Sequence, residues 1–165
     1  SVAGRLEYFK GENDIIAAVD YAHTPDALEN VLVTLKELDC QGDLICVFGC
    51  GGNRDKTKRP EMGAIAAKYA NRVIVTSDNP RDENPEEIIA DIKAGMDIKA
   101  RAKSLFISNR EEAINTAILT AKEGSIILVA GKGHEDYQII NGVKHHFDDK
   151  EKIKEAFQML KESKN

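Results

Sequence analysis

The hydrophobic residues of the chain gather in short continuous runs, which alternate with polar loops and with segments of helical periodicity. A continuous apolar run is typical of a strand that is buried on both faces of a parallel sheet. Five runs predict such strands, at residues 15–19, 44–48, 73–76, 105–107 and 126–130. After the first run, hydrophobic residues recur three or four positions apart, which predicts an amphipathic helix. Similar spacing recurs in residues 62–69, 88–96 and 153–160.

Capping residues and prolines mark where the helices begin. Ser, Thr, Asp and Asn side chains accept hydrogen bonds from the free amides of a first helical turn, and proline fits the first position. On these grounds we expect helices to start after Thr24, Asn84, Asn109 and Asp148, and at Pro60. Residues 137–147 alternate loosely around Asn141-Gly142, which predicts a β-hairpin.

Strands and helices alternate along the whole chain, and this order predicts an α/β fold. We expect a Rossmann-like, mostly parallel sheet flanked by helices on both faces, with the β-hairpin near the C-terminus closing one edge. Residues 1–14 are polar and mixed, so we expect them to be the end of a linker, followed by one domain over residues 15–165. Because the chain begins with Ser1 rather than Met, we expect a fragment of a longer protein.

Composition narrows the class of protein. With 42% hydrophobic and 31% charged residues, the chain matches an ordinary globular domain. Its net charge of −5 argues against a nucleic acid or an anionic membrane surface as the partner, and no apolar run is long enough to span a membrane. The three cysteines contain no Cys-x-x-Cys pair, so we expect reduced thiols and a cytoplasmic location.

Polar and glycine-rich clusters follow four of the predicted strands, at residues 20–23, 49–59, 78–81 and 131–136. A parallel sheet brings the carboxyl ends of its strands to one edge, which is where ligands bind in open α/β folds. Glycines there would let backbone N–H groups approach an anion. Basic side chains add positive charge, and acidic ones could pair with an ammonium group. The basic residues are Arg54, Lys56, Arg59 and Arg81, and the acidic residues are Asp78 and Glu135. An amino acid, which carries both signs, suits this edge better than a simple polyanion.

The loop of residues 78–81 has a sequence that favours a specific ligand contact. It follows an apolar strand, and Asn79-Pro80 ends regular structure because proline fixes its own φ and restricts the residue before it. Arg81 would thereby be presented at the end of the strand, where its planar guanidinium can bind two carboxylate oxygens. From these four residues alone, an ordinary loop with a solvated arginine is the alternative interpretation.

The sequence lacks the motifs of a complete nucleotide-hydrolysing site. Gly49-Cys50-Gly51-Gly52 does not match G-x-G-x-x-G, and no segment matches the P-loop pattern G-x-x-x-x-G-K-[ST]. His23 and His134 have no partners at metal-site spacing. No Ser-His-Asp or Cys-His arrangement can be argued from the spacing, so we assign no catalytic and no metal-ligating residue to this chain.

Five segments, taken in order, resemble the carboxy-terminal domain of the Mur ligases, in particular of the tripeptide-forming members. These segments are residues 20–28, 48–56, 58–60, 78–81 and 131–138. The resemblance implies an ATP-dependent ligase of peptidoglycan synthesis, which activates a UDP-linked precursor as an acyl phosphate and joins an amino acid to it. It also implies a central domain, absent from this chain, that carries the P-loop and the Mg²⁺ ligands and to which residues 1–14 would connect. This domain alone is then expected to be inactive.

The resemblance further implies roles for individual residues. The amino-acid site is matched by Arg54, Asp78, Asn79, Pro80, Arg81, Gly131 and Glu135, and the positions that contact ATP are matched by Arg5, Asp20 and His23. In the family, the Asp-Asn-Pro-Arg form accompanies meso-diaminopimelate, whereas lysine-adding relatives usually lack that arginine. Diaminopimelate carries one more carboxylate than lysine, and a bidentate arginine suits it. Leu6, Asn53 and Thr57 depart from the usual family residues, but none of them is the recognition arginine.

Several alternatives remain beside this interpretation. A related diamino dicarboxylic acid such as lanthionine would satisfy the same residues. A free-standing sensor domain that binds an amino acid or a nucleotide is a second class of function, and a ligase that extends folate or cyanophycin is a third. The expected partners are small molecules, namely meso-diaminopimelate, ATP with Mg²⁺ and the UDP-N-acetylmuramoyl dipeptide. We expect a monomer.

Overall fold

The computed structural model describes residues 6–164, whose main sheet has six strands in the order β1-β2-β6-β3-β4-β5. The strands are β1 (Glu7–Lys10), β2 (Ile16–Asp20), β3 (Leu44–Phe48), β4 (Arg72–Val75), β5 (Ser104–Phe106) and β6 (Ile126–Ala130). All pairings among β2 to β6 are parallel, whereas β1 runs antiparallel to β2 at one edge. The prediction of a mostly parallel sheet is confirmed.

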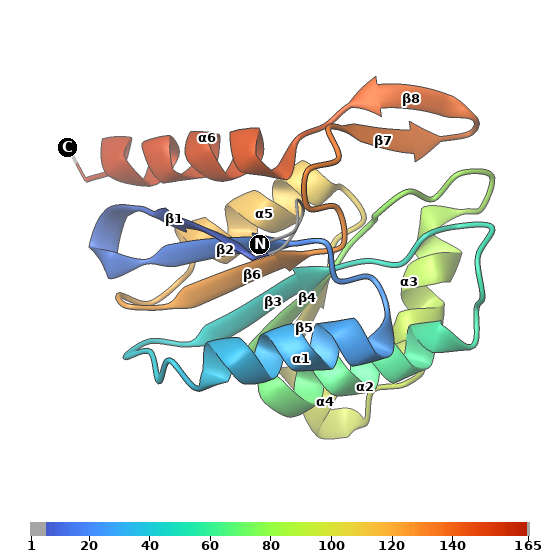
Figure 1. The fold of residues 1–165 in the computed structure, drawn as a ribbon, viewed down its shortest axis with the longest axis horizontal. Helices are drawn as coiled ribbons and strands as arrows, with labels where there is room; N and C mark the ends of the chain where they lie inside the picture. The colour runs from blue at the N-terminus through green and yellow to red at the C-terminus, as the bar shows by residue number, and fades with distance from the viewer. Residues whose placement is uncertain (1–5, 165) are drawn as a thin grey trace.

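Helices cover both faces of this sheet (Figure 1). One face packs against α1 (Pro25–Lys36), α2 (Lys58–Tyr69), α3 (Pro85–Lys93) and α4 (Ile98–Ala102). The other face packs against α5 (Arg110–Leu119) and α6 (Asp149–Glu162). A short 3-10 helix, η1 (Glu12–Asp14), lies between β1 and β2. Each face therefore has its own hydrophobic core, as expected for a Rossmann-like α/β domain.

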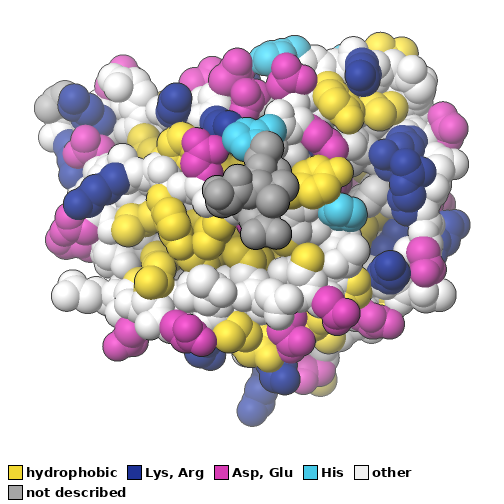
Figure 2. Space-filling view, viewed as in Figure 1, with side chains coloured by type: hydrophobic (Ala, Val, Ile, Leu, Met, Phe, Trp, Pro, Cys, Tyr) yellow, Lys and Arg dark blue, Asp and Glu magenta, His cyan; other side chains and the backbone are white. Residues whose placement is uncertain are grey.

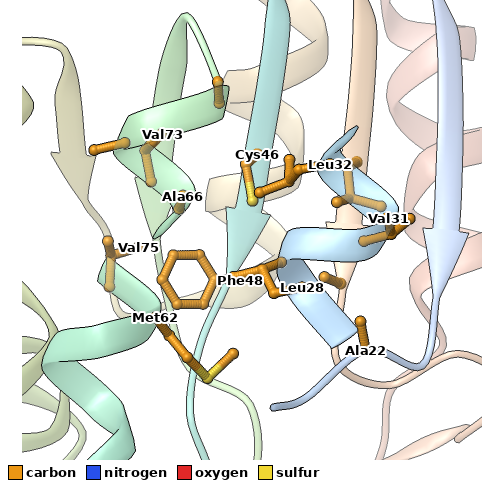
Figure 3. Packing of buried hydrophobic residues seen from close by; sticks show 14 of the residues in the cluster. Ala22, Leu28, Val31, Leu32, Cys46, Phe48, Met62, Ala66, Val73 and Val75 are labelled. Carbon is orange, nitrogen blue, oxygen red and sulfur yellow. The ribbon is translucent and has the colours of Figure 1, made fainter. Parts of the chain in front are cut away.

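Phe48, the last residue of β3, illustrates how the first core is built. Its side chain is 1% exposed, and its ring lies among Leu28 of α1, Met62 of α2 and Val75 of β4 (Figure 3). Every residue of β3 and of β6 is buried, because helices cover both sides of these central strands. This burial is the physical reason why both strands appear in the sequence as continuous apolar runs.

Four of the five predicted helix starts have the expected capping contacts. The side chains of Thr24, Asn84, Asn109 and Asp148 accept hydrogen bonds from backbone amides in the first turns of α1, α3, α5 and α6. The start of α2 differs from the prediction, because this helix begins at Lys58 and Pro60 is its third residue. Proline is tolerated throughout a first turn, where its missing N–H leaves no helical hydrogen bond unmade.

Two expectations about the sheet edges are wrong. Within residues 1–14, which we expected to be a linker, residues 7–10 form β1 and pair with β2; this short edge strand lacks a continuous apolar run. The predicted hairpin exists as β7 (Tyr137–Ile140) and β8 (Val143–His146), but it forms a separate two-stranded sheet instead of closing an edge of the main one.

The short helix α4 was not predicted, because five residues are too few for a periodic pattern.

Lys and Arg side chains gather on the side of the molecule that carries the loop between β3 and α2, with acidic side chains interspersed (Figure 2). Cys40, Cys46 and Cys50 are free thiols, in agreement with the prediction. No helix within residues 6–164 combines the length and the apolar character that crossing a membrane requires.

Candidate functional site

The loops that follow β2, β3, β4 and β6 meet at the carboxyl ends of the strands and surround a cavity of about 360 Å³. The cavity is lined by Tyr21, His23, Thr24, Gly49, Cys50, Gly51, Arg54, Asp55, Lys58, Arg59, Met62, Asp78, Asn79, Arg81, Gly131 and Glu135. The prediction that these four loops share one edge of the sheet is confirmed. A cavity of this size suits a small molecule such as an amino acid.

Most of the residues predicted for a ligand site line this cavity. They are His23, Arg54, Asp78, Asn79, Arg81, Gly131 and Glu135. Pro80 instead lines a second hollow on the other side of its loop. Asp20 lies at the end of β2, where its Oδ2 accepts a hydrogen bond from the amide of Ala22 at 2.8 Å. Arg5 lies outside the described residues. Pro80 and Asp20 therefore shape the loops without forming the cavity wall.

Arg81 is held at both its backbone and its side chain. Its φ of 52° is uncommon for a residue other than glycine, and its amide donates to the carbonyl of Ile139 at 2.9 Å. Its Nη1 donates to the carbonyls of Gly52 at 3.0 Å and Asn79 at 3.4 Å. Within residues 6–164, no hydrogen bond or ion pair engages its Nε–Nη2 edge. That edge is the one that can bind a carboxylate through two parallel hydrogen bonds.

The hairpin β7–β8 holds the loop that carries Arg81. The amide of Asn141 donates to the carbonyl of Arg81 at 2.7 Å, and Gln138 Nε2 donates to the carbonyl of Asp78 at 2.7 Å. We predicted the hairpin from the sequence but assigned it no role. Because these contacts join residues as many as 60 positions apart, no local pattern could reveal them.

The glycine-rich loop after β3 allows two loops to pack closely. The amide of Gly52 donates to the carbonyl of Asn79 at 2.8 Å, and a Cβ on Gly52 would lie 1.8 Å from the carbonyl oxygen of Pro80. A Cβ on Gly49 would lie 2.2 Å from the carbonyl oxygen of Thr76. The expectation that these glycines open their N–H groups to an anion is wrong for Gly52, whose N–H is already bonded within the protein.

Arg59 is committed to the protein interior. It is 1% exposed, forms ion pairs with Glu83 and Asp91 at 2.9 Å each, and donates to the carbonyl of Gly51 at 2.9 Å. Hydrogen bonds from Arg59 and from the amide of Asn53 lower the pKa of Glu83 to about 2. The expectation that Arg59 adds a free charge for a ligand is therefore wrong.

Arg54 differs from Arg59 in being exposed on the cavity rim. Within the described part of the chain, its guanidinium has one hydrogen-bond partner, the carbonyl of Asn53 at 3.0 Å. Neither Arg54 nor Arg81 forms an ion pair with a carboxylate of residues 6–164, so these two cavity-lining arginines retain charge for a ligand. Asp78, on the same loop as Arg81, and Glu135, on the loop after β6, provide negative charge.

Arg110, which was not among the residues predicted for the site, connects two of the cavity loops. It is fully buried, and its Nε and Nη2 donate to the two carboxylate oxygens of Asp149 at 2.8 Å. Its Nη1 also donates to the carbonyl of Ser77 at 2.9 Å, and its Nη2 to that of Ala130 at 3.2 Å. Burial acts to lower the pKa of Arg110, but the Asp149 carboxylate raises it above its usual value, so the side chain stays charged.

The loop after β2 presents two rings at the cavity rim. His23 Nδ1 hydrogen-bonds to the carbonyl of Tyr21 at 2.9 Å, and the two rings meet edge to face with their centroids 4.7 Å apart. Exposed rings of this kind can contact a planar base. Among the residues that the structure describes, no group of three or more His, Cys, Asp or Glu side chains could hold a metal ion.

Comparison with known proteins identifies the relatives of this chain. Residues 4–133 match the family model described as "Mur ligase, glutamate ligase domain". A UDP-N-acetylmuramoyl-L-alanyl-D-glutamate--2,6-diaminopimelate ligase from Bacteroides thetaiotaomicron is 57% identical over 157 residues, covering 94% of this chain and 33% of that protein. The protein of the same name from Clostridioides difficile is 52% identical over 159 residues, covering 96% and 32%. The chain thus spans about a third of the length of these curated relatives.

Solved structures agree with this family. The structure of a UDP-N-acetylmuramoyl-L-alanyl-D-glutamate--2,6-diaminopimelate ligase matches 98% of this chain and 32% of its own, with a TM-score of 0.90 and 46% identity. A bifunctional folylpolyglutamate synthase/dihydrofolate synthase matches 79% of this chain and 29% of its own, with a TM-score of 0.61 and 18% identity, and so shares the fold alone. The chain therefore belongs to the Mur ligase family, in which it corresponds to the carboxy-terminal domain.

Proposed function

We propose that this chain is the amino-acid-binding domain of a MurE-type ligase, which joins meso-diaminopimelate to UDP-N-acetylmuramoyl-L-alanyl-D-glutamate at the expense of ATP. The observation that carries the proposal is Arg81. Its Nη1 is fixed by two carbonyls, while its Nε–Nη2 edge has no partner within residues 6–164. A cavity-lining arginine held in this way is preorganised to bind a carboxylate in a bidentate manner.

The charges around the cavity match those of diaminopimelate. This amino acid has two carboxylates and two amino groups, whereas lysine has only one carboxylate. In the proposal, Arg81 binds the carboxylate that lysine lacks, Arg54 neutralises the other one, and Glu135 pairs with an ammonium group. With lysine in the cavity, the Arg81 edge would be left without its acceptor, and a site built around a charged contact strongly rejects a ligand that lacks it.

The residues of this chain position the amino acid, and other parts of the protein complete the reaction centre. ATP, when bound, supplies the phosphoryl group that activates the precursor's carboxylate for attack by the incoming amine. In the proposal, the exposed rings of Tyr21 and His23 contact the adenine base, and the carboxylate of Asp20 contacts a ribose hydroxyl. Because the chain contains no P-loop, we assign the phosphates and Mg²⁺ to a central domain outside this chain, and we propose that Arg5 contacts ATP.

Substrate preference of the full-length parent protein tests the proposal. UDP-N-acetylmuramoyl-L-alanyl-D-glutamate, ATP and Mg²⁺ are offered with meso-diaminopimelate, lysine or lanthionine in parallel, and phosphate release is followed. We expect turnover with diaminopimelate and none with lysine. Lanthionine carries the same charged groups, so its relative kcat/KM decides between the two diamino dicarboxylic acids. Turnover with lysine, or with none of the three, would overturn the proposal and favour a different ligase or a sensor domain.

A further inference from the structure

Lys132 is a buried cation between two loops of the cavity. Its side chain is 0% exposed, although lysine is almost never fully buried without partners. Its Nζ donates to the carbonyl of Tyr137 at 2.7 Å and to Asn79 Oδ1 at 3.0 Å. The same atom lies 3.3 Å from Asp78 Oδ1 and 3.7 Å from Glu135 Oε1. One ammonium group therefore joins the loop after β4 to the loop after β6.

This ammonium leaves the local charge incompletely balanced. Asp78 and Glu135 contribute two negative charges against the one positive charge of Lys132, so the cluster carries one net negative charge. Asp78 Oδ1 is buried and receives no hydrogen bond from any residue that the structure describes, although Lys132 lies nearby. Buried carboxylate oxygens normally have a hydrogen-bond donor. One ammonium group of a ligand in the cavity, beside Asp78 and Glu135, would supply the missing charge.

Lys132 also determines how Asn79 is oriented. Asn79 Oδ1 accepts hydrogen bonds from Lys132 Nζ and from the amide of Ile139, both at 3.0 Å. Because both donors bind the side-chain oxygen of Asn79, the orientation of its amide is fixed. The Nδ2 group therefore donates to Glu135 Oε1 at 3.4 Å. Lys132 therefore acts on Glu135 twice, through its own charge and through the orientation of Asn79.

We infer that Lys132 is a positioning residue, which holds the carboxylates of Asp78 and Glu135 in place to receive an ammonium group of the incoming amino acid. Without the buried cation, these two carboxylates would repel each other and move apart. The inference rests on the proposed function, since it concerns the same amino-acid site. It adds a residue that touches no ligand group itself and acts through Asp78, Asn79 and Glu135.

The test uses Lys132→Met in the full-length parent protein, because methionine is unbranched, nearly as long as lysine and uncharged. We expect the KM for diaminopimelate to rise about tenfold or more, with a smaller change in kcat and an ATP KM within about twofold of wild type. Lys132→Arg, which retains the charge, should recover part of the loss. If Lys132→Met does not fold, Lys132→Gln serves as a second neutral variant, since its amide can still donate to the carbonyl of Tyr137.

A double-mutant cycle separates positioning from general stabilisation. If Lys132 acts through Glu135, Lys132→Met should have a much smaller effect on the KM in a Glu135→Gln background than in the wild type. Lys103→Met is the matched control, because Lys103 is half-buried and donates to the carbonyl of Ala70 at 2.7 Å, beside the amino end of β5 and outside the cavity lining. It should leave the KM for diaminopimelate unchanged.

The outcomes distinguish this inference from the proposed function. A wild-type parent that does not use diaminopimelate refutes the proposed function, whatever the variants do. A wild-type parent that uses diaminopimelate, combined with an unchanged KM in a folded Lys132→Met or Lys132→Gln variant, refutes the positioning role alone. Equal effects in the wild-type and Glu135→Gln backgrounds, or a parallel rise in the KM for ATP, would also refute it.

Discussion

Asp149→Ala should strongly destabilise the chain. The side chains of Asp149 and Arg110 are both 0% exposed, and two hydrogen bonds of 2.8 Å join them. Without Asp149, the guanidinium of Arg110 would remain buried with only the carbonyls of Ser77 and Ala130 as partners. Removing one member of a buried ion pair costs about 3–5 kcal/mol, because the other charge is left uncompensated.

Urea-induced unfolding followed by circular dichroism measures this loss. In a thermal melt of a domain of this size, the same destabilisation would lower Tm by about 6–20 °C. Asp43→Ala is the control, since its carboxylate lies 4.0 Å from Lys122, whose side chain is 75% exposed. A pair whose lysine is this exposed contributes about 0–1 kcal/mol. If Asp149→Ala also lost less than about 1 kcal/mol, the reasoning about the buried charge would be refuted.

A second variant tests the stated cause. Asp149→Leu combined with Arg110→Met leaves no charge in the interior, so this double variant should be more stable than Asp149→Leu alone. If the double variant were less stable than the single one, the loss would come from packing and not from the uncompensated charge.

Two further predictions concern the cavity and its surroundings. In the full-length parent, Arg81→Ala should raise the KM for diaminopimelate about 30-fold or more, since truncating one partner of a hydrogen-bonded charge pair costs at least about 2 kcal/mol; an equal rise in the KM for ATP would instead indicate a structural role. Hydrogen bonds, first of all from Arg59, lower the pKa of Glu83 from 4.5 to about 2, so its contribution to stability is complete above pH 4.5 and is lost as the pH falls toward 2. Urea unfolding at several pH values should show a flatter acid limb for Glu83→Gln, and an unchanged slope would contradict this assignment.

The sequence by itself determined most of the secondary structure and the edge of the sheet where the site lies. Strands such as β3 and β6 are buried on both faces, so their apolar runs are visible without any tertiary information. Capping side chains such as Asn84 and Asn109 act on amides within their own first turn, and so a local pattern locates them. The carboxyl ends of parallel strands always share one edge, which is why the four polar loops could be grouped in advance.

Only the tertiary structure decided which charges are available to a ligand. Arg59 and Arg81 look alike in the sequence, yet Arg59 is neutralised by Glu83 and Asp91, whereas the Nε–Nη2 edge of Arg81 has no partner within residues 6–164. Lys132 owes its place beneath the cavity to partners that include Asn79, 53 residues distant. The physical reason is that burial and ion pairing depend on contacts between distant segments, and these contacts leave no periodic or local signal in the chain.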